Sequence, residues 1–210
     1  MNINGETKII GFFGSTYRTS KMYAMYNTAF EHLKINCVYV PFVVNDLAKG
    51  VEGMRHVGIH AVGVTIPYKI AIIPFLDELD DNAKRIGAVN VVVNNNGRLI
   101  GGNTDGEGAV MGLKEKTAVS GKQVTLLGAG GAARAIAFAI KDEGGILTIL
   151  NRTAQEAKEL AAAVGCDFGG LDELGKIIKD TNILIQSTSV GMAPQVNKSL
   201  VPKALLHKGL

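Results

Sequence analysis

The chain has 210 residues, 47% hydrophobic and 20% charged, which is enough apolar content for one large domain or two small ones with hydrophobic cores. Its formal net charge of +3 is modest and the basic residues are scattered, without a basic stripe carrying interleaved aromatic residues, so nucleic acid is not an expected partner. Every apolar stretch falls short of the roughly 18 residues of a membrane span, so no membrane association is expected.

The first half of the chain alternates short apolar runs with segments of helical periodicity. Apolar runs of four to seven residues predict strands, and apolar residues at helical spacing predict helices. The predicted strands are 8–13, 37–43, 61–64, 88–93 and 99–102. The predicted helices are 22–33, 47–54, 67–76 with Pro74 interrupting it, and 80–86. The residues NNNG at 94–97 are a strong hairpin signal between the last two strands.

The second half continues with a helix at about 107–115 and a polar segment, 116–122, which is the best candidate for a domain boundary. Predicted strands follow at 123–127, 145–150, 166–168 and 182–186, alternating with helices at 132–142, 154–164 and 171–178. Such alternation predicts a parallel, doubly wound sheet. A complete fold of this kind holds more strands, so we expect the second domain to be C-terminally incomplete. The fold class expected is therefore α/β with two domains.

A glycine-rich turn stands between the first strand and the first helix of the second domain, reading GAGGAA at 128–133. In a dinucleotide-binding unit the first glycine allows the tight turn, the second admits the pyrophosphate, and a third small residue lets helix and strand pack. Gly128, Gly130 and Ala133 hold these positions. These small residues could serve packing alone, but their place between strand and helix favours a Rossmann-like cofactor site. The cofactor-binding residues expected here are Gly128, Ala129, Gly130, Gly131 and Ala132.

Asn151, Arg152 and Thr153 follow the next strand, near the position about 20 residues after the fingerprint that recognises the ribose. NAD enzymes usually place an acidic residue there for the 2′-hydroxyl, whereas an arginine suits a 2′-phosphate. Asparagine does not repel a phosphate, and Arg152 offers a planar fork of donors. These residues favour NADP over NAD. The alternative is an ordinary Asn-Arg turn in which Thr153 caps the next helix.

The cysteines and histidines bear on the compartment and on metal binding. Cys37 and Cys166 lie far apart in apolar contexts, which indicates reduced thiols rather than a disulfide or a metal site. The four histidines lack metal-ligand spacing, so no metal is expected. The first residues, MNINGETK, lack the charged head and apolar core of a signal peptide. We therefore expect a cytoplasmic protein.

Three further motifs precede the glycine turn: Thr65-x-Pro67-x-Lys69, Gly87-Ala88-Val89-Asn90 and Asn103-Thr104-Asp105-Gly106. Together with the turn, Asn151-Arg152-Thr153 and the segment STSVGM at 187–192, they run in an order that resembles the shikimate dehydrogenase family from Gly11 onward. The resemblance implies a substrate-binding domain over 1–105, a linking helix and linker over 106–120, and an NADP-binding domain over 121–210. It places the active site in the cleft between the domains.

The resemblance also implies roles for individual residues. It makes Lys69 and Asp105 the catalytic pair and adds Ser20, Thr65 and Asn90 as substrate-binding residues. The loop after Gln186 would lie beside the nicotinamide, with Thr188, Ser189 and Met192 in the cofactor site. Ketone reduction needs a hydride from the cofactor and a proton for the developing alkoxide, which a lysine beside a carboxylate can supply.

Each of these residues also has an ordinary structural explanation when taken alone. Lys69 could be an exposed helix lysine, Asp105 the N-cap before Gly106, and Asn90 a turn residue. The segment 187–189 could be a polar loop after a strand. The joint pattern, rather than any single motif, favours the catalytic assignment.

The chain departs from the family pattern in its substrate loop. Where the family usually has Ser-x-Ser-Pro the chain reads SKMY at 20–23, Tyr26 replaces a histidine, and Gly63 replaces an asparagine. Met22 cannot replace a hydroxyl donor. A substrate carboxylate would then be held by other residues of this loop, unless they are simply solvated: Arg18, Lys21, Ser15, Thr16 or Tyr17. Changed donors are expected to change substrate preference.

The function expected is an NADP-dependent oxidoreductase that reduces 3-dehydroshikimate to shikimate in the chorismate pathway of aromatic amino acid biosynthesis. Alternatives are a paralogue acting on quinate, aminoshikimate or another cyclic hydroxy acid, and a catalytically idle NADP-binding sensor. The presence of both Lys69 and Asp105 argues against the sensor. The expected partner is a small cyclic hydroxy or oxo acid, and the protein is a monomer or a homodimer.

Overall fold

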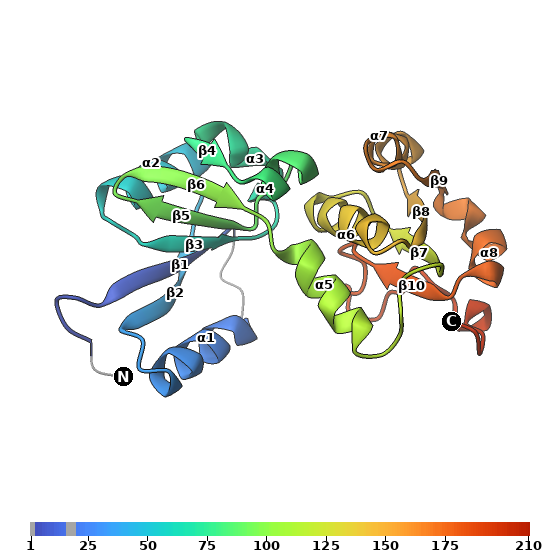
Figure 1. Cartoon of the computed structure of the whole chain (residues 1–210), viewed down its shortest axis with the longest axis horizontal. Helices are drawn as coiled ribbons and strands as arrows, with labels where there is room; N and C mark the ends of the chain where they lie inside the picture. The colour runs from blue at the N-terminus through green and yellow to red at the C-terminus, as the bar shows by residue number, and fades with distance from the viewer. Residues whose placement is uncertain (1–2, 16–19) are drawn as a thin grey trace. The chain divides into compact units, whose positions relative to one another are not determined.

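The structure, a computed structural model, describes residues 3–15 and 20–210. Its contacts divide the chain into two units, Met1–Thr104 and Asp105–Leu210 (Figure 1). Each unit contains one sheet with helices packed against it. The residue boundaries 1–105, 106–120 and 121–210 expected from the sequence stay a prediction, and the structure groups the helix that begins at Asp105 with the second unit.

The first unit is a mixed sheet of six strands in the order β2-β1-β3-β5-β6-β4. Strands β1, β2 and β3 are parallel, and β5 runs antiparallel to both β3 and β6. Its elements are β1 (Lys8–Gly14), α1 (Lys21–His32), β2 (Cys37–Val43), α2 (Leu47–His56), β3 (Ala61–Val64), α3 (Tyr68–Ala71), the 3₁₀ turn η1 (Ile73–Phe75), β4 (Glu78–Leu79), α4 (Asp81–Ile86), β5 (Val91–Asn95) and β6 (Arg98–Gly102).

Local sequence signals explain several element ends in this unit. Asp46 caps α2 by accepting a hydrogen bond from the Lys49 N–H, and Asp80 caps α4 through the Ala83 N–H. The β5–β6 hairpin turns through Asn96 and Gly97, both at positive φ, as a two-residue primed turn requires.

Two predicted elements of this unit differ from the structure. The helix expected at 67–76 is split into α3 and η1, because Pro74 has no N–H to continue the helical hydrogen bonds. The strand expected at 88–93 begins only at Val91, since the Val89 N–H bonds to the Lys69 carbonyl of α3 instead of a strand. Both differences lie next to predicted site residues.

The second unit is a parallel sheet of four strands in the order β10-β7-β8-β9. Its elements are α5 (Asp105–Lys114), β7 (Gln123–Leu127), α6 (Gly131–Asp142), β8 (Ile146–Asn151), α7 (Ala154–Val164), β9 (Asp167–Gly170), η2 (Leu171–Glu173), α8 (Leu174–Ile177), η3 (Ile178–Asp180), β10 (Ile183–Gln186) and η4 (Lys203–Leu205). The helix predicted at 171–178 is thus divided into 3₁₀ and α pieces.

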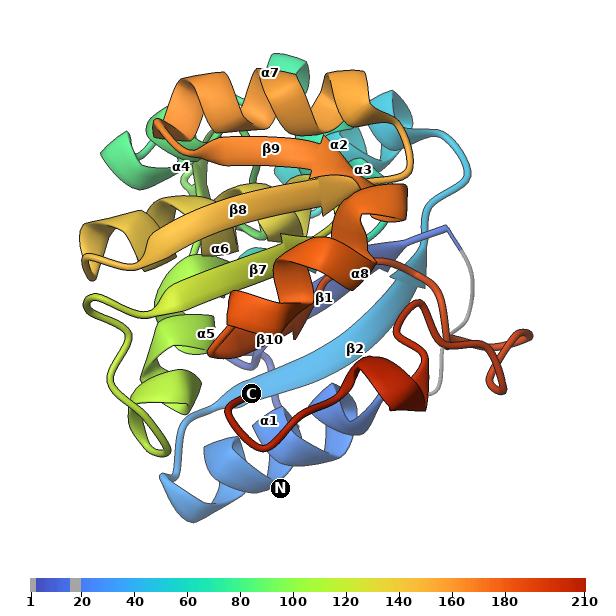
Figure 2. The same cartoon turned by 90° about the vertical axis from the view of Figure 1, so that its right-hand side faces the viewer.

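Hydrophobic clusters cover both faces of this sheet. Figure 2 shows α8 in front of the strands and α6 behind them. On the α6 face Leu126 packs in one cluster with Ala133 and Ala137, while on the α8 face Leu127 packs with Leu174. The strand order reverses between β7 and β10, which creates a topological switch point at their carboxyl ends.

Helix α5 lies against α6 through a glycine. A Cβ added at Gly106 would collide with the carbonyl oxygen of Ala135, and it would stand 3.0 Å from the Cβ of Ala139. The absence of a side chain at Gly106 is therefore what allows the two helices to approach. This contact explains why α5 belongs to the second unit.

Candidate active site

The glycine turn after β7 is built around Gly128. Its φ of +114° is accessible to glycine and strained for other residues. A Cβ there would lie 3.0 Å from the Ser187 Oγ and 3.1 Å from the Thr188 Cγ2, and the Gly128 N–H donates to the Leu150 carbonyl at 2.8 Å. One residue therefore joins the carboxyl ends of β7, β8 and β10.

The second glycine of the turn, Gly130, has a different role. It is the N-cap of α6, with extended backbone, and a Cβ at this position would meet no described atom within 4 Å. Ala133, one turn into the helix, is fully buried in the core. The turn is thus open beside Gly130 among the described residues, and the N–H groups of a first helical turn favour an anion such as a pyrophosphate. The expected cofactor is compatible with this geometry.

The loop after β10 lies against this turn. The Ser187 N–H and Oγ both donate to the Leu127 carbonyl, at 2.9 and 3.0 Å. The Gln186 amide donates to the Val190 carbonyl at 2.8 Å and accepts from the Thr188 N–H, so these two hydrogen bonds fix the backbone conformation of the loop. Met192 is 44% exposed. Thr188 and Gly128 are thus brought together, whereas Gln186 is a positioning residue that the sequence reasoning missed.

The end of β8 carries the residues predicted to meet the ribose. The Asn151 amide nitrogen donates to the Glu156 Oε2 at 2.6 Å and to the Thr153 carbonyl at 3.2 Å. Arg152 is exposed. Thr153 occupies the N-cap position of α7, yet its side chain makes no capping hydrogen bond. The alternative in which Thr153 is there to cap the helix is therefore not supported.

The predicted substrate residues of the first unit share a hydrogen-bonded frame. Asn90 and Thr104 are joined twice, by Asn90 Nδ2 to Thr104 Oγ1 and by the Thr104 N–H to Asn90 Oδ1, each at 3.0 Å. The Val64 N–H donates to the Asn90 carbonyl at 2.7 Å, so the chain segment that leads into Thr65 lies beside Asn90. The Val89 N–H donates to the Lys69 carbonyl at 2.7 Å. Thr65, Lys69, Asn90 and Thr104 therefore belong to connected segments.

Asn103 is a structural residue that the motif reading did not explain. It is 2% exposed, and its side-chain amide donates to the Ala88 carbonyl at 2.8 Å. Its own carbonyl accepts from the Asn82 amide at 2.7 Å. These bonds tie the end of β6 to α4 and to the segment that carries Asn90.

Lys69 lies in the first unit, whereas Asp105 is the first residue of α5 and opens the second. Asp105 is thus inside the helix rather than the N-cap preceding it. The pairing of the two side chains stays a prediction.

Ser20 is the N-cap of α1, and its Oγ accepts from the Met22 N–H at 3.2 Å. Among the loop residues proposed to hold a carboxylate, Ser15 and Lys21 are described. Thr16, Tyr17 and Arg18 lie outside the described residues.

Two family models match the chain. The model for the shikimate dehydrogenase substrate binding domain covers residues 12–92, and that for shikimate / quinate 5-dehydrogenase covers residues 111–208. The shikimate dehydrogenase (NADP(+)) of Pyrococcus furiosus is 44% identical over 209 residues, which is 99% of this chain and 76% of that relative. The chain belongs to the shikimate dehydrogenase family.

Solved structures of this family agree. A shikimate dehydrogenase in complex with NADP+ matches with a TM-score of 0.89 at 38% identity, covering 98% of this chain and 75% of that one. A Listeria monocytogenes shikimate 5-dehydrogenase in complex with shikimate and NAD matches with a TM-score of 0.86 at 34% identity, covering 100% of this chain and 78% of that one. The predicted family and the two-domain α/β fold with a Rossmann-like second domain are confirmed.

The departures from the family pattern at Tyr26 and Gly63 are linked in space. The Tyr26 ring stacks on Tyr39 with centroids 4.6 Å apart, and a Cβ at Gly63 would lie 3.0 Å from the Tyr39 Oη. The Tyr39 hydroxyl is buried and has no hydrogen-bond partner among the described residues, and burial raises its pKa. The space beside Gly63 is thus occupied by an aromatic cluster that also includes Phe12 and Tyr23.

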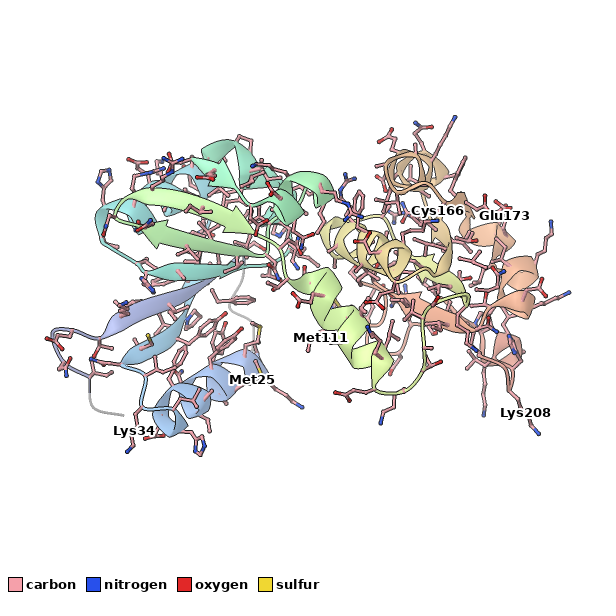
Figure 3. The ribbon with its side chains drawn as sticks, viewed as in Figure 1. Met25, Lys34, Met111, Cys166, Glu173 and Lys208 are labelled. Carbon is pink, nitrogen blue, oxygen red and sulfur yellow. The ribbon has the colours of Figure 1, made fainter. Side chains whose placement is uncertain are left out.

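Residues 3–15 and 20–210 contain no cluster of three or more potential metal-binding side chains, and no helix among them is long and apolar enough to span a membrane. Both cysteines are free. Cys166 lies between α7 and β9 (Figure 3), and its burial raises the pKa of its thiol to about 11. The thiol is therefore protonated at neutral pH, and only the thiolate form is a strong nucleophile.

Proposed function

We propose that the chain is an NADP-dependent oxidoreductase that reduces 3-dehydroshikimate to shikimate. The observation that carries this proposal is the turn at Gly128 and Gly130. There one glycine lets the ends of three strands meet and the other leaves the start of α6 open to a pyrophosphate. The support for the substrate is the 44% identity to the Pyrococcus furiosus shikimate dehydrogenase (NADP(+)).

In this proposal NADPH supplies the hydride to the ketone carbon. Lys69 delivers a proton to the oxygen that becomes the alcohol. Asp105 orients the lysine and assists the return of a proton to its amine. Ser20, Thr65 and Asn90 hold the ring substituents. Asn90 is suited to this task because its two hydrogen bonds with Thr104 fix the orientation of its side chain.

The cofactor residues proposed are the turn residues 128–132, the 151–153 segment at the ribose, and Thr188, Ser189 and Met192 at the nicotinamide. Thr188 is the best supported of the last three, because its methyl group lies close to Gly128 of the glycine turn. The oligomeric state proposed is monomer or homodimer, to be measured by light scattering. The free thiols agree with a cytoplasmic location.

The deciding experiment follows loss of NADPH absorbance with a panel of oxo acids. It contains 3-dehydroshikimate, 3-dehydroquinate and the amino analogue of 3-dehydroshikimate. Fastest turnover of 3-dehydroshikimate supports the proposal, and preference for another member selects the paralogue reading, which the changes at Met22 and Gly63 would explain. Tight NADPH binding without turnover of any member would instead indicate a sensor.

A further inference from the structure

A carboxylate stands at the place where the cofactor's ribose is recognised. Glu156, in the first turn of α7, accepts a hydrogen bond from the Asn151 amide at 2.6 Å. Asn151 ends β8, and its neighbour Leu150 accepts the N–H of Gly128 from the glycine turn at 2.8 Å. The residue after the second strand of such a unit contacts the ribose 2′ group. The Glu156 carboxylate is therefore one hydrogen bond away from the residue at that position.

The hydrogen bonds of Asn151 determine what its side chain can offer a ligand. Its amide nitrogen carries two hydrogens, and they point to the Glu156 carboxylate and the Thr153 carbonyl. Both partners are acceptors, so the orientation of the amide follows from chemistry. Asn151 is left presenting an acceptor, Oδ1, which suits a 2′-hydroxyl and disfavours a phosphate.

The charges at this position have opposite signs. Arg152 is exposed at the end of β8 and attracts a 2′-phosphate. Glu156 is exposed too, and its carboxylate, bonded to the Asn151 amide, would repel a phosphate held beside Asn151. The effects of Arg152 and Glu156 on the binding of a 2′-phosphate therefore partly cancel. The carboxylate does not weaken the binding of a neutral 2′-hydroxyl.

We infer that Glu156 is a specificity-determining residue. It lowers the preference for NADP(H) over NAD(H), so that this chain binds the two cofactors with comparable affinity. This rests on the proposed cofactor site and adds a second cofactor to it. The Listeria monocytogenes relative crystallised with shikimate and NAD belongs to the same family, so a 2′-hydroxyl cofactor is compatible with this fold. A purely structural alternative is that Glu156 stabilises α7 as an acidic residue in its first turn.

The test compares Glu156→Gln with the wild-type chain. Glutamine keeps an oxygen that can accept from Asn151 but removes the charge. Glu159→Gln is the matched control, because Glu159 is exposed one turn further along α7 and bonds to Gln155. Dissociation constants for NADPH and NADH are measured by nicotinamide fluorescence at low and moderate salt. Those for adenosine 2′,5′-bisphosphate and ADP are measured by competition.

The wild-type chain should bind NADPH no more than about tenfold more tightly than NADH, a difference of about 1.4 kcal/mol. Glu156→Gln should tighten NADPH and adenosine 2′,5′-bisphosphate by about 5- to 20-fold at low salt, with less effect at higher salt. NADH and ADP should stay within about twofold, as should all four ligands with Glu159→Gln.

Three results would overturn the inference: a wild-type preference for NADPH above about a hundredfold, an unchanged NADPH affinity in Glu156→Gln, or an equal gain with Glu159→Gln. A lower melting temperature of Glu156→Gln with unchanged ligand affinities would identify the structural role of α7 instead. None of these readouts needs turnover. Failure of the substrate panel would reject the proposed reaction and leave the cofactor inference standing.

Discussion

Gly128 and Gly130 show that two glycines in one turn meet different requirements. At Gly128 the backbone conformation and the contact with Ser187 and Thr188 both exclude a side chain. At Gly130 the backbone is extended and the neighbouring space is open, so the protein itself does not exclude a side chain there. The open space beside Gly130 would admit the proposed cofactor, so Gly130 is the more informative of the two about function.

Lys69 is tested by Lys69→Ala. If its amine handles the proton, kcat for ketone reduction should fall by about 10²- to 10⁴-fold, the range for removal of a general acid. The dissociation constant of NADPH should change little, because Lys69 is proposed to act on the substrate. Lys84→Ala, at an exposed lysine on α4, is the control and should keep wild-type activity. An unchanged rate in Lys69→Ala would remove Lys69 from the mechanism.

Arg152 is tested by Arg152→Ala. Loss of a charged hydrogen bond to the 2′-phosphate should weaken NADPH binding by about 1.5–3 kcal/mol and leave NADH nearly unaffected. Fluorescence titration of both cofactors measures this, with Lys158→Ala on the exposed side of α7 as the control. Equal weakening of NADPH and NADH would show that Arg152 does not contact the 2′-phosphate.

Individual site residues differ in how far the sequence reveals them. The motifs predict Thr65, Lys69, Asn90 and Asp105 as site residues, because their spacing within short segments is visible in the sequence. The contact of Tyr39 with Tyr26 and Gly63 is not visible, since it joins β2, α1 and β3. The Asn151–Glu156 bond could have been suspected, because an acidic residue follows within the first turn of the predicted helix.

At the scale of elements, the contact between α5 and α6 depends on Gly106. Gly106→Ala should lower the free energy of unfolding of the second unit by about 1–3 kcal/mol, because its methyl group overpacks against the Ala135 carbonyl. Gly108→Ala is the matched control on the same helix, where a Cβ meets nothing within 4 Å. It should raise stability by about 0.5–1 kcal/mol. Urea unfolding followed by circular dichroism measures both, and equal effects would contradict the packing argument.

An ion pair in the first unit gives a pH dependence. The Arg55 guanidinium at 2.7 Å, and then the Leu99 N–H at 2.6 Å, hold the pKa of the Asp77 carboxyl below its usual range. A carboxyl whose pKa is lower in the folded state stabilises the fold above its unfolded pKa and loses this contribution as the pH falls through the folded pKa.

The corresponding variant is Asp77→Asn. It should be less stable than the wild-type chain at neutral pH, and the difference should shrink on acidification below the usual pKa of an aspartate. Thermal unfolding measured across this acidic range tests the expectation. Asp81→Asn, at a fully exposed residue of α4, should change stability little at any pH. A difference between Asp77→Asn and wild type that does not vary with pH would refute the electrostatic explanation.

Element boundaries were predictable where a local signal exists. Asp46, Asp80 and the Asn96–Gly97 turn mark their elements in the sequence as they do in the structure. The predicted helix at 171–178 was wrong in detail, since it is divided between η2, α8 and η3. Gly175 lowers the helical preference there, and Leu174 and Ile178 still reach the core from the short pieces. Burial of these apolar side chains, rather than helical continuity, determines the conformation of this segment.

At the scale of the whole molecule, each unit has its own hydrophobic cluster, so ligands are expected to protect them separately. NADPH should slow hydrogen exchange of backbone amides at 124–131, 150–157 and 183–192, and leave β1, β2 and α2 of the first unit unchanged. Exchange monitored by mass spectrometry, with and without NADPH, provides the measurement. Protection confined to the first unit would refute the assignment of the cofactor site to β7 and α6.

The sequence by itself determined the order of strands and helices, the glycine turn and the family, because apolar periodicity, caps and motif spacing are properties of neighbouring residues. Only the tertiary structure decided that β10 lies beside β7, that Ser187 and Thr188 close on Gly128, and that Tyr39 occupies the space beside Gly63. These contacts join segments far apart in the chain. They depend on which strands pair and which faces are covered, and no local pattern specifies that.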